Sequence, residues 1–155
     1  MVSSELKTFL MVGKKLNEEG IIPVLFGSLA VVMLTGKDIV VNDIDLLVPD
    51  AWVAEKWGEL IKLMSRFGFV VHNETEHEFV LDNKIVAFAY ESTLGDVALT
   101  TADLLKKEVN EVKFLLPKAD QLLKVYQYSR DDGYRLGKRN DNGKISLLEE
   151  FIRLT

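Results

Sequence analysis

Two short segments of the chain contain the residue types from which a reactive site can be built. The first is Asp43-Ile44-Asp45, which opens an apolar stretch that ends at Val48. Side chains alternate between the two faces of a strand, so both carboxylates would point to the same side, close enough to share a divalent cation. The alternative is a strand end with two solvated aspartates, and this pair alone does not separate the two interpretations.

The second segment is Gly27-Ser28, which separates the apolar run Ile21–Phe26 from a second apolar run, Leu29–Leu34. Glycine lets the backbone turn sharply and lets a ligand approach it closely. Ser28 would lie at the N-terminus of a helix, where unpaired N–H groups and the helix dipole favour a bound phosphate. The alternative is a serine that only caps the helix after a glycine turn.

The composition limits the chemistry that the remaining residues can supply. The chain has 155 residues, and the absence of cysteine excludes disulfides, thiol nucleophiles and thiolate metal sites. With only two histidines, a metal site built from several histidines is nearly excluded as well. With 24 acidic and 19 basic residues, the net charge of −5 argues against an extended nucleic-acid-binding surface. It does not exclude a small nucleotide bound together with Mg²⁺. Reactive groups must therefore come mainly from carboxylates, hydroxyls, lysine and arginine.

The hydrophobic pattern predicts an α+β (α/β) fold, with a mixed β-sheet and packed helices. The length predicts a single domain over residues 1–155, with its core at about 20–116 and C-terminal helices at about 117–155. Helices are expected at about 4–19, 29–34, 51–66, 117–129 and 145–154, and strands at about 21–26, 43–48, 69–71, 78–81, 85–90 and 112–115. The segment 92–110 is ambiguous, and its residues 102–107 are compatible with a short helix. No secretory signal or membrane-spanning run is recognised, so a cytoplasmic protein is expected.

The two reactive segments are more specific together than apart. A strand, Gly-Ser, a helix and then a strand that opens with D-x-D resembles the nucleotidyltransferase superfamily, which has the polymerase-β-like fold. The stretches that carry the resemblance are Leu25–Ala30 and Asn42–Val48. Within the superfamily the chain is most similar to small bacterial minimal and antibiotic nucleotidyltransferases. A looser resemblance extends through residues 78–90 and through the helix start at 116–124.

This resemblance implies a role for each matched residue. Gly27 and Ser28 would hold the β- and γ-phosphates of a nucleoside triphosphate, and Asp43 and Asp45 would bind Mg²⁺, with two ions if a third carboxylate is supplied. The expected reaction transfers a nucleoside monophosphate, with ATP as the expected donor, to a hydroxyl of a small molecule, a protein or RNA. Lys124 is a further candidate for contact with the triphosphate, and the alternative is a solvated helix lysine.

The chain departs from the family pattern at the third carboxylate. Ala87 occupies the position where the family has an aspartate, and strand alternation places Ala89 and Glu91 on the same face. Glu91 is therefore the catalytic candidate on that strand, about 13 Å further along it. Glu78 on the neighbouring strand is another substitute. If neither reaches the site, the alternative is a catalytically weakened protein that binds a nucleotide or a protein partner, for example in a defence or toxin–antitoxin pair.

The basic residues near the C-terminus have two interpretations. The cluster comprises Arg130, Arg135, Lys138 and Arg139, which would either neutralise a nucleotide or contact an RNA acceptor, or else form a charged loop. The sequence does not identify the acceptor or the preferred base. A homodimer or a protein partner would be able to complete the pocket, but no residue pattern demands one.

Overall fold

The seven strands formed by the described residues belong to one mixed sheet. The computed structural model describes residues 3–131 and 141–155, and the strand order within them is β3-β4-β5-β2-β1-β7-β6. The strands are β1 (Val24–Phe26), β2 (Asp43–Val48), β3 (Val70–Asn73), β4 (Glu78–Leu81), β5 (Lys84–Tyr90), β6 (Leu105–Val109) and β7 (Val112–Leu116). β2 runs parallel to β5 and β1 runs parallel to β7, whereas the other neighbouring pairs are antiparallel. The predicted α+β fold with a mixed sheet is confirmed.

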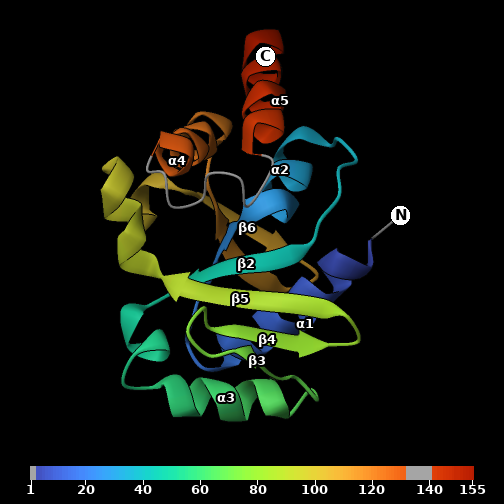
Figure 1. Ribbon diagram of the computed structural model, residues 1–155, viewed down its shortest axis with the longest axis vertical. Coiled ribbons are helices and arrows are strands. Elements are labelled where there is room, and N and C mark those ends of the chain that lie inside the picture. The colour runs from blue at the N-terminus through green and yellow to red at the C-terminus, as the bar shows by residue number, and fades with distance from the viewer. Residues whose placement is uncertain (1–2, 132–140) are drawn as a thin grey trace.

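Helices cover both faces of this sheet (Figure 1). The described helices are α1 (Ser4–Glu18), α2 (Gly27–Thr35), α3 (Trp57–Ser65), α4 (Ala119–Asp131) and α5 (Asp141–Leu154), with the 3₁₀ helices η1 (Asp50–Val53), η2 (Glu91–Val97) and η3 (Thr101–Asp103). α1 packs against β7 and α3 against β3, whereas α2 packs against β1 and β2 and contacts α4 and α5. In the part of the chain that the structure describes, no helix is both long and apolar enough to cross a membrane.

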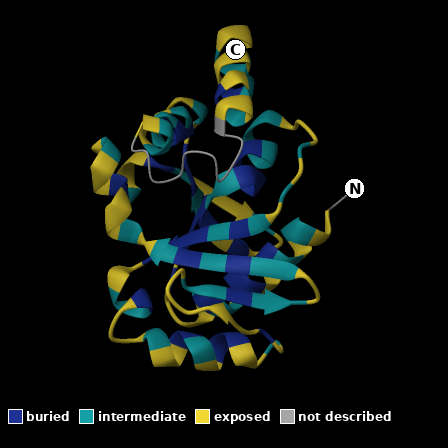
Figure 2. Cartoon of the chain, in the orientation of Figure 1, coloured by how far each residue is buried: buried dark blue, intermediate teal, exposed yellow. Residues whose placement is uncertain are grey.

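The alternation of side chains along β2 separates the hydrophobic core from the reactive face. Ile44 and Leu46 are fully buried, and Leu46 pairs with Leu25 of β1 and Phe88 of β5 in one apolar row across the sheet. Asp43 and Asp45 are half-buried and point to the opposite face. Figure 2 shows this alternation as changes between buried and intermediate colour along β2 and β5.

Local signals in the sequence explain where several elements begin and end. The Ser3 hydroxyl accepts a hydrogen bond from the Leu6 N–H and so caps α1. Gly36, in the left-handed conformation with φ 72°, ends α2. Asp82 and Asn83 both have positive φ and form the two-residue hairpin turn between β4 and β5.

The structure decides one segment that is ambiguous in the sequence and corrects one expected helix. Residues 102–107 do not form a helix, because the chain is already in β6 from Leu105 and pairs with β7 around Asn110 and Glu111, which both have positive φ. Such a two-residue turn favours an antiparallel hairpin over a helix. The expected helix 51–66 is divided into η1 and α3, since residues 54–56 interrupt the helical pattern.

Candidate functional site

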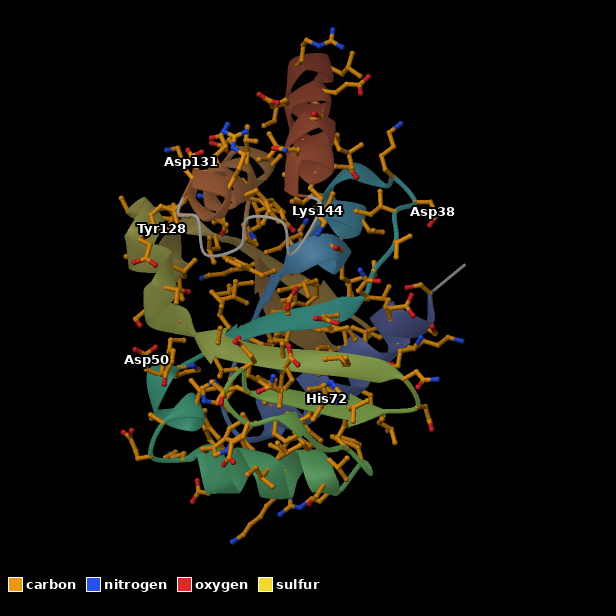
Figure 3. All side chains as sticks on the ribbon, viewed as in Figure 1. Asp38, Asp50, His72, Tyr128, Asp131 and Lys144 are labelled. Carbon is orange, nitrogen blue, oxygen red and sulfur yellow. The ribbon has the colours of Figure 1, made fainter. Side chains whose placement is uncertain are left out.

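The reactive face of the sheet forms the floor of a cavity of about 690 Å³. Its walls are α4 and η2, which contact each other, and Tyr128 is labelled in Figure 3 where α4 lies beside η2. One row of paired residues crosses the floor from β3 to β1: Asn73, Glu78, Ala87, Asp45 and Phe26. The volume is typical of a site for a small organic ligand.

Gly27 and Asp45 are in direct contact at one end of this cavity. Phe26 pairs with Asp45 across β1 and β2, and the chain turns into α2 at the next residue. Gly27 has φ 71°, and a Cβ atom placed on it would overlap Oδ2 of Asp45 and lie 3.1 Å from its Cγ. Glycine is therefore required here twice, for its backbone conformation and for the carboxylate that occupies the space of a side chain.

The N-terminus of α2 lies beside this contact. Phe26 is the N-cap residue, and its hydrocarbon side chain cannot accept a hydrogen bond from the N–H groups of the first turn. Ser28 is the second residue of the helix and is 7% exposed, so it does not occupy the N-cap position. The N–H groups of a helix's first turn have no partner within the helix, and together with the positive end of the helix dipole they make this turn suitable for an anion such as a phosphate.

Asp43 and Asp45 form the candidate cation site. They are two residues apart on one face of β2, with Asp45 lining the cavity and Asp43 nearer the start of the strand. Hard carboxylate oxygens at this spacing suit Mg²⁺, which commonly takes one or two carboxylates and completes its shell with phosphate oxygens and water. Among residues 3–131 and 141–155, no three His, Asp or Glu side chains form a group that could hold a metal ion on their own.

The structure places small apolar residues where the family resemblance leads one to expect a third carboxylate. Ala87 is the direct neighbour of Asp45 across β2 and β5. Glu78 of β4 is the direct neighbour of Ala87 on its other side, and it also lines the cavity. The nearest acid in this row beyond Asp45 is therefore one strand further away than the family pattern has it.

Glu91 lies elsewhere. It follows the last paired residues of the two strands, Val48 and Tyr90, and within the described residues it is not part of the cavity lining. The acid that acts on Glu91 is Asp50, which Figure 3 labels at this end of β5. Burial, with a smaller contribution from the negative charge of Asp50, raises the pKa of Glu91 above its ordinary value.

The basic candidates are not brought to the described cavity wall. Lys124 is exposed on α4, whose cavity-facing residues include Val125 and Ser129. Arg130 forms an ion pair with Asp131, with Nε 3.3 Å from Oδ1. The other members of the predicted basic cluster, Arg135, Lys138 and Arg139, lie outside the described residues.

Several residues of the cavity were not singled out by the sequence. They come from the end of β3, from the turn before β4, from η2 and from α4: Asn73, Glu76, Thr93, Asp96, Tyr128 and Ser129. The helical spacing of Leu122, Val125, Tyr126 and Ser129 was a usable signal, since these positions share one helix face. Nothing local marks Asp96, because its segment lacked a recognisable period.

A comparison with known proteins places the chain in a family. No model of a known protein family matches the chain. The uncharacterized protein YnaI of Bacillus subtilis (strain 168) is 37% identical over 151 residues, which covers 94% of this chain and 96% of that protein. The chain belongs to the same family as YnaI.

Solved structures show which fold this YnaI relative has. The antigenic nucleotidyltransferase-like protein from Paracoccidioides brasiliensis matches with a TM-score of 0.64 and 19% identity, over 100% of this chain and 78% of that chain. ANT(2'')-Ia in complex with adenylyl-2''-tobramycin matches at 0.63 and 16%, over 98% and 95%. The lincomycin-bound lincosamide antibiotic adenylyltransferase LnuA matches at 0.61 and 15%, over 97% and 98%. The chain shares the fold of these nucleotidyltransferases, which confirms the fold that the sequence resemblance implies.

Proposed function

We propose that this protein is a nucleotidyltransferase that transfers a nucleoside monophosphate from a nucleoside triphosphate, with ATP as the donor, to a hydroxyl group. The contact between Gly27 and Asp45 is the observation that carries the proposal. It joins the N-terminus of a helix, whose N-cap residue Phe26 makes no side-chain hydrogen bond, to a carboxylate at the edge of a cavity large enough for a small molecule. The protein would carry out this reaction in the cytoplasm, where the triphosphate and Mg²⁺ are both available.

In this proposal the chain acts mainly by positioning. The backbone N–H groups at Gly27 and Ser28 bind the β- and γ-phosphates, as helix N-termini bind anions. The α-phosphate then lies above β2, toward Asp45, and the acceptor occupies the rest of the cavity between η2 and α4. Holding donor and acceptor in one orientation supplies a large part of the rate enhancement in such reactions.

The pair Asp43 and Asp45 would hold Mg²⁺. Carboxylate oxygens on one strand face are suitable ligands, and a bound triphosphate supplies further oxygens. When bound, Mg²⁺ neutralises phosphate charge and polarises the phosphoryl oxygens. Two ions would require a third carboxylate close to this pair.

A specific observation favours a second candidate function. Ala87 is the direct neighbour of Asp45, and no third acid of the described residues joins the pair. A protein with this arrangement could bind a nucleotide and turn it over slowly or not at all, and so serve as a nucleotide-dependent interaction module. The two functions differ in whether the bound nucleotide is transferred to an acceptor hydroxyl.

The test is a transfer assay with ATP labelled at its α-phosphate. The full chain is incubated with MgCl₂ and with water, tobramycin, lincomycin, a polyol mixture or short RNA as acceptors, and AMP and AMP adducts are separated. We expect Mg²⁺-dependent labelling of an acceptor by the wild type and loss of at least about 100-fold in Asp45→Asn. Asp38→Asn serves as the matched control, because Asp38 is exposed on the loop after α2.

The outcomes separate the two candidate functions. Labelling that requires Asp45 but not Asp38 supports the transferase. Mg²⁺-dependent ATP binding without any labelled product supports the interaction module. Labelling that is equal in wild type and Asp45→Asn would contradict the assignment of the site.

A further inference from the structure

A single row of paired residues relates the Asp45 carboxylate to a second acid across the sheet. Ala87 pairs with Asp45 on one side and with Glu78 on the other, so all three side chains project from the same face. Asp45, Ala87 and Glu78 all line the cavity. The two acids are therefore two strand spacings apart, about 9–10 Å between their Cα atoms.

We propose that Glu78 is the catalytic base of this protein, and that it has taken over across one strand the role left open by Ala87. This inference rests on the proposed nucleotidyl transfer and assigns one residue to its chemical step. A glutamate side chain is long enough to extend over the neighbouring strand, and the methyl group of Ala87 leaves the space above it open. That space, bounded by one carboxylate at each end, is where the acceptor hydroxyl would lie.

The step assigned to Glu78 is a proton transfer coupled to nucleotidyl transfer. A lone pair of the acceptor oxygen forms the new bond to the α-phosphorus, while the bond from that phosphorus to the oxygen shared with the β-phosphate breaks. Pyrophosphate leaves with the electrons of the broken bond. The proton of the acceptor hydroxyl passes to the Glu78 carboxylate, which then releases it to water, so the residue is regenerated.

The separation of Glu78 from Asp45 fits a base rather than an additional ligand. No three acids of the described chain converge on one ion position, so Glu78 does not complete a metal cluster. A gap between two carboxylates is what a reaction needs when an acceptor hydroxyl must fit between them. Glu91 does not compete for this role, because it lies beyond the end of β5 beside Asp50 and outside the lining.

The assay uses the α-labelled ATP reaction described above with five variants: Glu78→Gln, Glu91→Gln, Ala87→Asp, Glu74→Gln and the double variant Glu78→Gln/Ala87→Asp. We expect Glu78→Gln to lose about 10²–10⁴-fold in product formation, which is the usual contribution of a general base. Its affinity for ATP with Mg²⁺, measured by calorimetry, should change less than threefold. Glu78→Gln/Ala87→Asp should recover at least tenfold, because it returns a carboxylate to the same row. Glu74→Gln, in the exposed turn before β4, is the matched control and should keep wild-type activity.

Each outcome decides between the inference and its alternatives. Product formation that survives Glu78→Gln, or that is lost in Glu91→Gln instead, overturns the role of Glu78 and leaves the transferase standing. If only the single variant Ala87→Asp turns an inactive wild type into an active enzyme, no third acid is present naturally, and the inference fails. If neither the wild type nor Ala87→Asp forms product with any acceptor, the proposed function fails and the inference fails with it. Loss in Glu78→Gln with unchanged ATP binding and rescue by Ala87→Asp supports both.

Discussion

The two ends of the cavity are built in different ways. At the phosphate end, Gly27 and Asp45 are close in the sequence, separated by one helix and one loop. The Asp45 carboxylate fills the space that a side chain at position 27 would need. At the acceptor end, Glu78 and Ala87 come from an antiparallel pair, and the walls come from η2 and α4, far apart in the sequence. The phosphate end therefore depends on a local motif, and the acceptor end depends on strand pairing and packing.

This difference predicts that damage to the two ends will have different consequences. The acceptor end is fixed by apolar packing, so its disruption should mainly lower the free energy of unfolding. The phosphate end is fixed by backbone geometry and a polar contact, so its disruption should mainly lower nucleotide affinity. Variants at each end can test this separation.

The largest expected change in stability comes from Leu94→Ala at the acceptor end. Leu94 is 2% exposed and packs η2 against Val24 and Leu47. Truncation leaves a cavity under η2 and should lower the free energy of unfolding by about 2–5 kcal/mol. Urea denaturation measures this loss, and calorimetry should show that ATP affinity changes less than tenfold.

The matched control for this variant is Leu154→Ala, because Leu154 is 70% exposed. Its effect should stay within about 0.5 kcal/mol, as expected of a surface position. Equal effects of the two substitutions would mean that η2 is not anchored by Leu94. A loss of ATP binding in Leu94→Ala while the protein is fully folded would show that the two ends are not separable.

A smaller effect on stability, with a larger one on binding, is expected of Gly27→Ala. An alanine at φ 71° is strained by about 1–2 kcal/mol, and its Cβ would displace the Asp45 carboxylate. Gly36→Ala is a close control, since Gly36 has φ 72° with nothing within 4 Å of the added Cβ. Both variants should lose similar backbone stability, and only Gly27→Ala should lose ATP binding. Similar ATP affinities in the two variants would contradict a site at Gly27.

The smallest expected effect concerns Glu91. Burial and then Asp50 raise its pKa, so the charged form is disfavoured in the folded state and stability contributed by the protonated form is lost as the pH rises through the raised pKa. Glu91→Gln should therefore raise the melting temperature slightly at pH 7, and the gain should disappear below about pH 4.5, the ordinary value of the group. Glu59→Gln on the exposed side of α3 is the control. A stabilisation that is independent of pH would show that the carboxylate charge is not its cause.

The same contrast explains which parts of the molecule could be predicted from the sequence. The strand Asp43–Val48 and the glycine-dependent change from strand to helix at Gly27 are encoded by neighbouring residues. The strand lies where the sequence places it, and the helix begins two residues earlier than expected. The segment 102–107 is ambiguous in the sequence, because its strand character depends on pairing with β7 beyond the turn at Asn110 and Glu111.

The acceptor side of the site was less accessible to prediction for a related reason. The position of Glu78 beside Ala87 follows from the register of β4 on β5, and the lining by Asp96 follows from the packing of η2. Neither the strand register nor the packing of η2 is determined by residues that are close in the chain. The sequence offers both Glu91 and Glu78 as substitutes for the missing acid, and only the strand register shows that Glu78 lies in the same row as Ala87.

Calorimetric titration of ATP with Mg²⁺ into the wild type and Asp45→Asn tests the central claim most directly. The substitution keeps the shape of the side chain and removes its charge. We expect saturable, Mg²⁺-dependent binding by the wild type and a loss of at least about 30-fold in affinity for the variant, as when one partner of a close charge pair is removed. Equal binding by both proteins, or binding by neither, would contradict a nucleotide site at Gly27 and Asp45.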